Sequence, residues 1–195
     1  MTPPNPFPDH FPEILSGDLR IVEFSESHLT PRYVSWLNDP ETVRFSEQRH
    51  RVHTIDSCRD YFVSQSASNN YFLAIEETSA GLGHIGNVGV TMDIHNHSAD
   101  ISIIIGEKQQ RGRGFGLTAW NAVLNACFDQ LKLRIITAGT MEPNHSMVRV
   151  FEKSGMIIEA VLSKRFLWEG SETGMVLASI HRCVFDANHS EEQNS

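Results

Sequence analysis

Gln110-Arg111-Gly112-Arg113-Gly114-Phe115-Gly116 separates a run of isoleucines from a strongly helical segment, residues 116–131. Its glycines alternate with other residues, which lets the main chain approach a ligand closely and take dihedral angles that side chains disfavour. Successive N–H groups can then point inward, backed by the positive end of the following helix, and such an arrangement binds phosphate. Arg111 and Arg113 add positive charge nearby. We therefore interpret residues 110–116 as a phosphate- or pyrophosphate-binding loop; the alternative is a Gly/Arg-rich helix entry without a ligand.

The spacing of this loop argues against two other nucleotide-binding motifs. A P-loop requires GxxxxGK[ST], which the sequence lacks. A dinucleotide-binding fingerprint requires GxGxxG early in a βαβ unit, with an acidic residue about 20 positions later. The loop reads GxGxG instead, and the next strand-like run, residues 134–140, supplies no acidic residue.

On either side of the loop, hydrophobic periodicity predicts seven strands and four main helices. Three strands in direct succession before the loop indicate an antiparallel meander. The pattern is typical of an α+β, or mixed α/β, domain with helices on the faces of its sheet. The predicted strands are residues 19–24, 71–75, 84–90, 99–105, 134–140, 157–168 and 172–182, and the predicted helices begin near residues 29, 54, 116 and 144.

The 195 residues have a globular composition, with 40% hydrophobic and 21% charged residues. We expect a single domain over residues 13–185, preceded by a flexible proline-rich segment, residues 1–12, and followed by a flexible polar tail, residues 186–195. The formal net charge of −8, without a basic run, disfavours a nucleic-acid partner.

Membrane insertion and metal binding are also disfavoured by the sequence. No run approaches the roughly 18 apolar residues of a membrane span, and the start of the chain lacks the apolar stretch of a signal peptide. We therefore expect a cytoplasmic protein. Three widely spaced cysteines, Cys58, Cys127 and Cys183, form no CxxC pair, so we expect neither a zinc site nor a disulfide framework.

Two motifs about 30 residues apart resemble the GNAT superfamily of N-acetyltransferases, and specifically its RimJ/RimL-like branch. Arg111, Gly114 and Gly116 match the acyl-CoA motif [Arg/Gln]-x-x-Gly-x-[Gly/Ala]. Residues 143–156, PNHSMVRVFEKSGM, are similar to the Asn-containing stretch of that branch. The order of predicted elements agrees over residues 19–182.

The resemblance implies a mostly antiparallel sheet whose middle strands, near residues 99–105 and 134–140, splay apart to hold acetyl-CoA as cosubstrate. The main chain of residues 104–106 would pair with the pantetheine arm, the amides of residues 111–116 would hold the pyrophosphate, and the Asn144 amide would contact the pantetheine. No metal is implied. The implied cosubstrate-binding residues are Ile104, Ile105, Gly106, Arg111, Gly112, Arg113, Gly114, Phe115, Gly116, Asn144 and Arg149.

Members of this family generally use direct attack of a neutral amine on the thioester, which requires orientation, carbonyl polarisation and proton transfer. Many relatives carry a tyrosine acid where this chain has Phe151, which cannot donate a proton. Ser146 is our hypothesis for the acid; the alternative is that it caps a helix.

The candidates for the general base are Glu47, His50 and Asp100. A histidine such as His50 titrates near neutrality. For Glu47 and His50 the alternative is a charged surface loop, and for Asp100 it is a polar strand entry. A base that acts through a chain of waters would leave no trace in the sequence.

The acceptor we favour is a small-molecule amine such as a nucleotide-linked amino sugar, because residues 36–54 resemble members that acetylate such sugars. A protein N-terminal amine of the ribosomal type and a polyamine are alternatives, the latter suited to the acidic net charge. Trp168 precedes the last predicted turn, near the acceptor-specificity loops of the family. A non-catalytic acyl-CoA-binding module is the rival class. Homodimers are common in the family.

Overall fold

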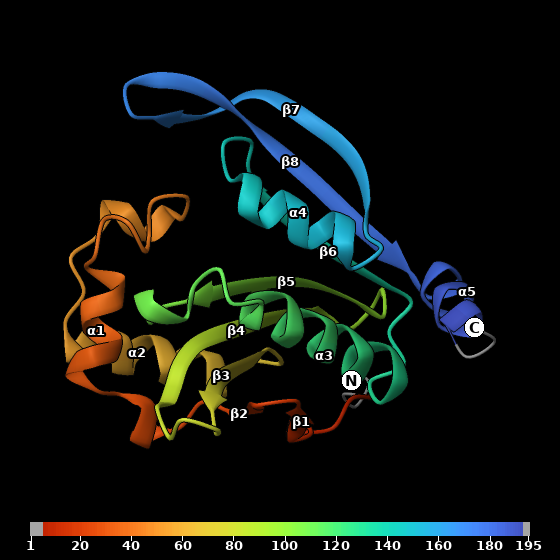
Figure 1. The fold of residues 1–195 in the computed structure, drawn as a ribbon, viewed down its shortest axis with the longest axis horizontal. Coiled ribbons are helices and arrows are strands. Elements are labelled where there is room, and N and C mark those ends of the chain that lie inside the picture. The colour runs from red at the N-terminus through yellow and green to blue at the C-terminus, as the bar shows by residue number, and fades with distance from the viewer. Residues whose placement is uncertain (1–5, 193–195) are drawn as a thin grey trace.

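The computed structural model describes residues 6–192, which form one eight-stranded sheet with the order β1-β2-β3-β4-β5-β6-β8-β7 (Figure 1). Five α-helices and three short 3-10 helices complete this part of the chain. The strands are β1 (Ile14–Ser16), β2 (Leu19–Glu23), β3 (Tyr71–Glu77), β4 (Gly83–Asp93), β5 (Ser98–Ile105), β6 (Ile135–Met141), β7 (Ile157–Trp168) and β8 (Ser171–His181). The α-helices are α1 (Pro31–Leu37), α2 (Ile55–Ser66), α3 (Phe115–Asp129), α4 (His145–Lys153) and α5 (Arg182–Glu192). The 3-10 helices are η1 (Glu26–His28), η2 (Glu47–His50) and η3 (Lys108–Gln110).

Every neighbouring pair of strands is antiparallel except β5 and β6. The parallel pairing of β5 and β6 runs only from Ser98–Ile135 to Asp100–Thr137, and beyond these residues the two strands diverge (Figure 1). The sheet therefore has two arms, one formed by β1 to β5 and the other by β6 to β8. The predicted fold class is confirmed, including the mostly antiparallel sheet.

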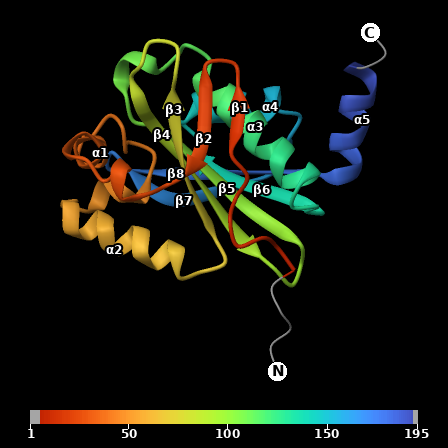
Figure 2. The ribbon, with the colours of Figure 1, turned by 90° about the horizontal axis from the view of Figure 1, so that it is seen from below.

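Helices cover both faces of the sheet (Figure 2). The sheet separates two hydrophobic clusters. On one face, α3 and α4 pack in the main core, where Trp120, Phe128 and Phe151 are fully buried. On the other face, α1 and α2 enclose a smaller cluster that includes Tyr33 and Trp36. Because large aromatic side chains remove much apolar area from water, these two clusters fix the helices on the sheet.

Local signals in the sequence start and stop the helices. Thr30 and Thr54 accept main-chain hydrogen bonds from the first turns of α1 and α2, and Pro31 begins α1. Asn144 caps α4 in the same way. Gly155, with φ 75°, follows the end of α4 in the left-handed conformation that glycine adopts without steric cost.

The ends of the chain differ from the expected flexible segments, residues 1–12 and 186–195, in the part that the structure describes. Phe7 and Phe11 are buried in the main core, and α5 continues the chain after β8. Phe185 of α5 stacks on Phe128 with ring centroids 4.5 Å apart. Apolar aromatic residues thus anchor segments whose overall composition is polar or proline-rich. Residues 1–5 and 193–195 lie outside the described residues, and the domain limits 13–185 stay a prediction.

Candidate active site

The divergence of β5 and β6 leaves one edge of β5 without a strand partner. Asp100 and Thr137 are the last paired residues, so residues 101–105 pair with β4 alone. An unpaired strand edge presents N–H and C=O groups that an extended ligand can use. The pantetheine arm was predicted to pair with residues 104–106, of which Ile104 lies on this unpaired edge, and the edge extends back to residue 101.

The glycine-rich loop leads directly into the first turn of α3. Gly112 and Gly114 have φ angles of 73° and 90°, and a Cβ at either position would meet no atom within 4 Å. Glycine is therefore favoured there by the backbone conformation, not by lack of space. Gly114 is the N-cap of the 15-residue helix α3, and no side chain caps this end. Uncapped N–H groups at the positive end of a helix are suited to a phosphate, so the loop fits the pyrophosphate of acetyl-CoA.

The two arginines of the loop differ in their environment. The half-buried Arg111 donates from Nε to the Ile105 carbonyl oxygen at 2.9 Å and from Nη2 to the Gly106 carbonyl oxygen at 2.9 Å. The exposed Arg113 donates to Gln110 Oε1 at 2.7 Å. The Gly106 N–H also has a partner, the Ile85 carbonyl oxygen at 2.9 Å. These contacts do not support Arg111 as a charge aimed at the phosphate or Gly106 as a partner of the pantetheine arm.

Helix α4 holds the candidates from the second motif. The Asn144 side chain accepts from the Met147 N–H at 3.4 Å and donates to Thr140 Oγ1 at 2.9 Å, so its amide joins α4 to the end of β6. Ser146 is exposed in the first turn, and because Asn144 caps the helix, the interpretation of Ser146 as the cap is wrong. Arg149 is exposed on the same helix. Phe151 is fully buried, with its ring centroid 5.7 Å from that of Trp120.

Asp100 lies where β5 and β6 begin to diverge. Thr137 Oγ1 donates to Asp100 Oδ2 at 3.0 Å. Solvent reaches the side chain, yet the surrounding protein desolvates the carboxyl group and raises its pKa above the ordinary aspartate value, while the hydrogen bond from Thr137 opposes that shift. A carboxyl group with a raised pKa is better matched to general-base catalysis near neutrality than an ordinary one.

Glu47 and His50 lie at the other end of the divergent strands. Both side chains are exposed on η2, and Glu47 pairs with Arg49 at 2.9 Å. Arg49 Nη1 lies 3.8 Å from Met141 Sδ at the end of β6. Met141 is four residues beyond the residue paired with Asp100, which corresponds to about 13 Å along the strand. The structure therefore separates Glu47 and His50 from Asp100, although the sequence treats all three as candidates for one role.

A contact between the two arms involves residues that sequence reasoning did not join. Trp168 Nε1 donates to the Arg44 carbonyl oxygen at 3.2 Å, and the Arg44 guanidinium lies 4.8 Å from the Trp168 ring centroid. Arg44 also pairs with Glu169 at 3.1 Å, and Phe45 packs on Trp168. The tip of the β7–β8 hairpin thus contacts the connection between α1 and α2. The opposite charges of Arg44 and Glu169 are the available signal, but 125 positions separate them.

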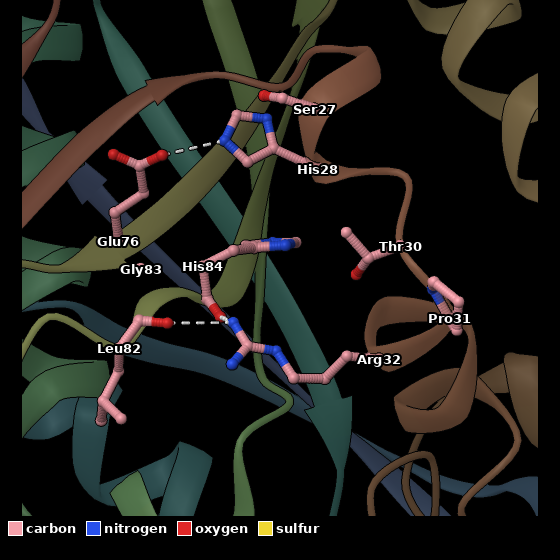
Figure 3. Close-up of a pocket in the computed structure, with 9 residues that line it drawn as sticks. All are labelled: Ser27, His28, Thr30, Pro31, Arg32, Glu76, Leu82, Gly83 and His84. Carbon is pink, nitrogen blue, oxygen red and sulfur yellow. Dashed lines mark hydrogen bonds and ion pairs between the residues drawn. The ribbon is translucent and has the colours of Figure 1, made fainter.

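A cavity of about 430 Å³ lies away from these residues, between the β2–α1 connection and the β3–β4 turn (Figure 3). His28 Nε2 lies 3.0 Å from Glu76 Oε1 inside it, and Arg32 donates to the main chain of Leu82 at 3.1 Å. The nearby ring of His84 makes no hydrogen bond of normal geometry. The cavity shares no lining residue with the glycine-rich loop or with Asp100, so it does not belong to the candidate active site.

Within residues 6–192, no group of three or more His, Cys, Asp or Glu side chains is arranged to hold a metal ion. No helix in the same range is both long and apolar enough to cross a membrane.

The sheet divides between the parallel strands β5 and β6, and β5 is followed by the glycine-rich loop and the uncapped helix α3. This is the acetyltransferase architecture that the motifs implied. A family model described as the acetyltransferase (GNAT) domain matches residues 18–157, which is well over half of the chain. The chain therefore belongs to the GNAT acetyltransferase family and is an acetyl-CoA-dependent acyltransferase.

Relatives with names and solved structures agree with this assignment. The spermidine N(1)-acetyltransferase of Vibrio cholerae serotype O1 is 26% identical over 156 residues, covering 79% of this chain and 82% of the relative. The crystal structure of a Vibrio cholerae spermidine N-acetyltransferase with CoA and spermine has a TM-score of 0.75 at 21% identity, covering 86% of this chain and 98% of that one. A ribosomal-protein-S5-alanine acetyltransferase from Vibrio fischeri has a TM-score of 0.74 at 14% identity, covering 88% and 97%.

Proposed function

We propose that this enzyme acetylates a primary amine of a small molecule and that Asp100 is its general base. The observation that carries the proposal is the position of Asp100 at the last pair of β5 and β6. From that point the unpaired edge of β5 extends toward the loop that fits the pyrophosphate. An acetyl-CoA held along this edge by residues 101–104 and 111–116 would direct its thioester toward Asp100.

In the proposed reaction, the acceptor enters as an ammonium ion and Asp100 removes one proton. The neutral nitrogen forms a bond to the acetyl carbon and loses a second proton to water, the carbon–sulfur bond breaks, and the CoA thiolate takes up a proton. An N–H group on the unpaired edge of β5 would polarise the carbonyl. Phe151 has no proton to donate and lies in the core. Ser146, exposed at the start of α4, is our proposal for the group that protonates the thiolate, directly or through water.

Two small acceptors have support. A polyamine is supported by the relative named as a spermidine acetyltransferase, by the net charge of −8 and by an anionic base at Asp100. A nucleotide-linked amino sugar is supported by the resemblance of residues 36–54 to family members that acetylate such sugars. We infer that the polyamine is the better candidate, because the named relative matches 79% of the chain rather than one segment.

Thiol release assayed with acetyl-CoA and a panel of amines tests this proposal. The panel would contain spermidine, spermine, a nucleotide-linked amino sugar and a peptide with the N-terminal sequence of a ribosomal protein. We expect turnover with a small amine and little with the peptide. Release with the peptide alone would contradict the small-molecule assignment, and acetyl-CoA binding without release by any amine would favour a non-catalytic acyl-CoA-binding module.

We also propose that the enzyme forms a homodimer through β7. This strand is an edge of the sheet and is 12 residues long, whereas the opposite edge, β1, has three residues. A long edge strand with apolar side chains invites pairing with another chain, and an identical copy supplies a complementary edge by twofold symmetry. The exposed large apolar residues of β7 are Ile157, Ile158, Val161, Leu162 and Leu167.

A further inference from the structure

Through Arg111 the glycine-rich loop contacts the connection between α1 and α2. We call this connection, together with the tip of the β7–β8 hairpin that it contacts, the acceptor side. Besides its bonds to the carbonyl oxygens of Ile105 and Gly106, Arg111 donates from Nη2 to Thr42 Oγ1 at 2.5 Å. Thr42 lies between α1 and α2, 69 positions away in the sequence. One guanidinium group therefore holds the end of β5, the start of the loop and the α1–α2 connection together.

The α1–α2 connection is ordered around this contact. Thr42 Oγ1 donates to Asp39 Oδ2 at 2.5 Å, and the Thr42 N–H donates to the same oxygen at 3.1 Å. The hydroxyl of Thr42 thus accepts from Arg111 while it donates to Asp39. Two positions further on, Arg44 makes the contacts with Trp168 and Glu169 of the β7–β8 hairpin. Asp39, Thr42 and Arg44 consequently connect the loop to the second arm of the sheet.

The end of β5 is also fixed against α1 in a way that leaves little freedom. A Cβ added at Gly106 would overlap the ring of Trp36. The Arg111 side chain therefore donates hydrogen bonds to a strand end that is already packed against α1. A guanidinium group can serve several acceptors at once because it carries five N–H donors in a rigid plane, and a lysine cannot reproduce this arrangement.

We propose that Arg111 is a positioning residue that couples the acetyl-CoA site to the acceptor side, so that the binding of one substrate favours the binding of the other. This proposal rests on the proposed function, because it takes residues 111–116 as the pyrophosphate site. When a pyrophosphate orders the loop, Arg111 is held against Thr42, and the connection that reaches the β7–β8 hairpin is held with it. The coupling is reciprocal, as any linkage between two binding sites must be.

The alternative role for Arg111 is direct neutralisation of the phosphates. The two roles differ in what Thr42 does, since Thr42 contacts Arg111 but belongs to another segment of the chain. The variant Thr42→Val keeps the shape of the side chain and removes the hydroxyl group that accepts from Arg111 and donates to Asp39. A phosphate-binding arginine would be indifferent to this change.

Hydrogen exchange with and without CoA tests the coupling independently of activity. In the wild type, CoA should slow exchange at the amides of residues 112–116 and also at those of residues 39–44, apart from Pro40, which has no N–H group. In Thr42→Val, protection should remain at 112–116 and be lost at 39–44. Lys108→Met is the matched control, because Lys108 pairs with Glu41 at 2.7 Å across the same two segments but is exposed, and such pairs contribute little. It should behave like the wild type.

Steady-state kinetics complete the test once an acceptor is known. Thr42→Val and Arg111→Lys should each lower kcat/KM for the acceptor by roughly tenfold, and the double variant should lose no more than the worse single variant, because the two residues act through one contact. The Kd of Thr42→Val for acetyl-CoA without acceptor should stay within about twofold of the wild type.

The outcomes separate the coupling from the function on which it rests. Protection of residues 112–116 by CoA in the wild type, without protection of residues 39–44, would overturn the coupling and leave the acetyl-CoA site intact. No protection at either segment would overturn the location of the pyrophosphate site itself. Additive losses in the double variant would show that Arg111 and Thr42 act separately and would also refute the coupling.

Discussion

Asp100 illustrates how a single register position can give a carboxyl group the distinct environment on which its proposed role as a base rests. It is the last residue of β5 that pairs with β6, so the residues that follow it have no partner on that side while it keeps Thr137 beside it. Desolvation by the surrounding protein raises its pKa. A carboxylate that is less stable in this position than in water is a stronger base than an exposed one.

Asp100→Asn tests this residue. Loss of a general base should lower kcat by about 10²–10⁴-fold, with the Kd for acetyl-CoA unchanged, and should remove the ionisation that raises kcat/KM with increasing pH. Because the raised pKa makes the charged form of Asp100 unfavourable in the folded state above its ordinary pKa, the variant should not be less stable at pH 7. Turnover and calorimetry measure both effects.

Glu47→Gln supplies the comparison for Asp100→Asn. Glu47 is exposed and paired with Arg49 at the far end of the divergent strands, so kcat should change by less than about threefold. The assignment to Asp100 would be lost if the Glu47 variant were the inactive one and the Asp100 variant kept its turnover.

In contrast to Asp100, whose pKa is raised, the buried His84 has a lowered pKa, because burial disfavours its protonated form. Its side chain lies among aromatic rings, with its centroid 4.9 Å from that of Trp36 and 5.1 Å from that of His28. Burial, together with the repulsion of the nearby His28, lowers its pKa to about 4. Figure 3 shows the His84 ring between His28 and Arg32.

The free energy of unfolding should therefore fall as the pH is lowered through the range from 6.5 to about 4. In this range the unfolded chain protonates His84 and the folded chain does not, so the unfolded state binds more protons. We expect a loss of about 2 kcal/mol between pH 7 and pH 5 from this residue. Urea denaturation at pH 7, 6 and 5 should show a flatter dependence for His84→Leu. The exposed residue His95 provides the control, and equal slopes for the His84→Leu and His95→Gln variants would contradict the prediction.

The sequence predicted the backbone elements of the site better than its side chains. The glycine-rich loop and the cap-forming Asn144 follow from residue type and spacing, because glycine conformation and helix capping are local effects. The partners of Arg111 cannot be predicted from residue type and spacing, because Thr42 lies far away in the sequence and contacts Arg111 only in the folded chain. The separation of Glu47 from Asp100 likewise depends on how η2 is placed relative to β6.

At the scale of the element, the glycine-rich loop gains the shape that we propose binds the pyrophosphate from two positive φ angles, at Gly112 and Gly114. An alanine at Gly114, where φ is 90°, would carry a cost of about 1–2 kcal/mol in the same conformation. Because the loop is exposed, it would relax without ligand, and acetyl-CoA would have to restore the strained form. Gly114→Ala should therefore weaken acetyl-CoA binding by about tenfold, measured by calorimetry.

Gly17→Ala is the matched control for the loop. Gly17 also has a positive φ angle, 56°, with no atom near the position of its Cβ, but it lies in the turn between β1 and β2. The free energy of unfolding of Gly17→Ala should fall by about 1–2 kcal/mol, the cost of a non-glycine residue in this conformation. The variant should bind acetyl-CoA with the wild-type Kd. If both variants bound acetyl-CoA equally well, the loop conformation would have no part in binding.

Elements with strong periodicity were predicted correctly, and those held by tertiary contacts were not. The predicted helix at residues 116–131 and strand at 157–168 correspond to α3 and β7. The prediction omits β1, which has three residues and pairs only with β2. It also omits α5, whose sequence is polar apart from a few residues such as Phe185, so that packing on Phe128 supplies what propensity does not.

At the scale of the whole molecule, the two edges of the sheet differ in a way that predicts assembly. The edge strand β1 is too short to template a partner, whereas β7 is long and Val161 and Leu167 on it are 51% and 73% exposed. Apolar side chains exposed along one edge are stabilised when a second copy covers them. The proposed homodimer places two β7 strands side by side around a twofold axis, so each substitution on β7 enters the interface twice.

Val161→Lys should convert this dimer into a monomer, because the substitution brings two positive charges into an apolar interface and leaves them without partners. Sedimentation equilibrium of the wild type at micromolar concentrations should give twice the mass of the chain, and the variant should give the mass of one chain. Val63→Lys, at a valine of α2 that is 55% exposed, changes the net charge equally away from β7 and should remain dimeric. A monomeric wild type, or a dimer that survives Val161→Lys, would exclude β7 as the interface. The glycine-rich loop, the proposed pyrophosphate site, lies on the other arm of the sheet, so the monomeric variant should keep the wild-type Kd for acetyl-CoA.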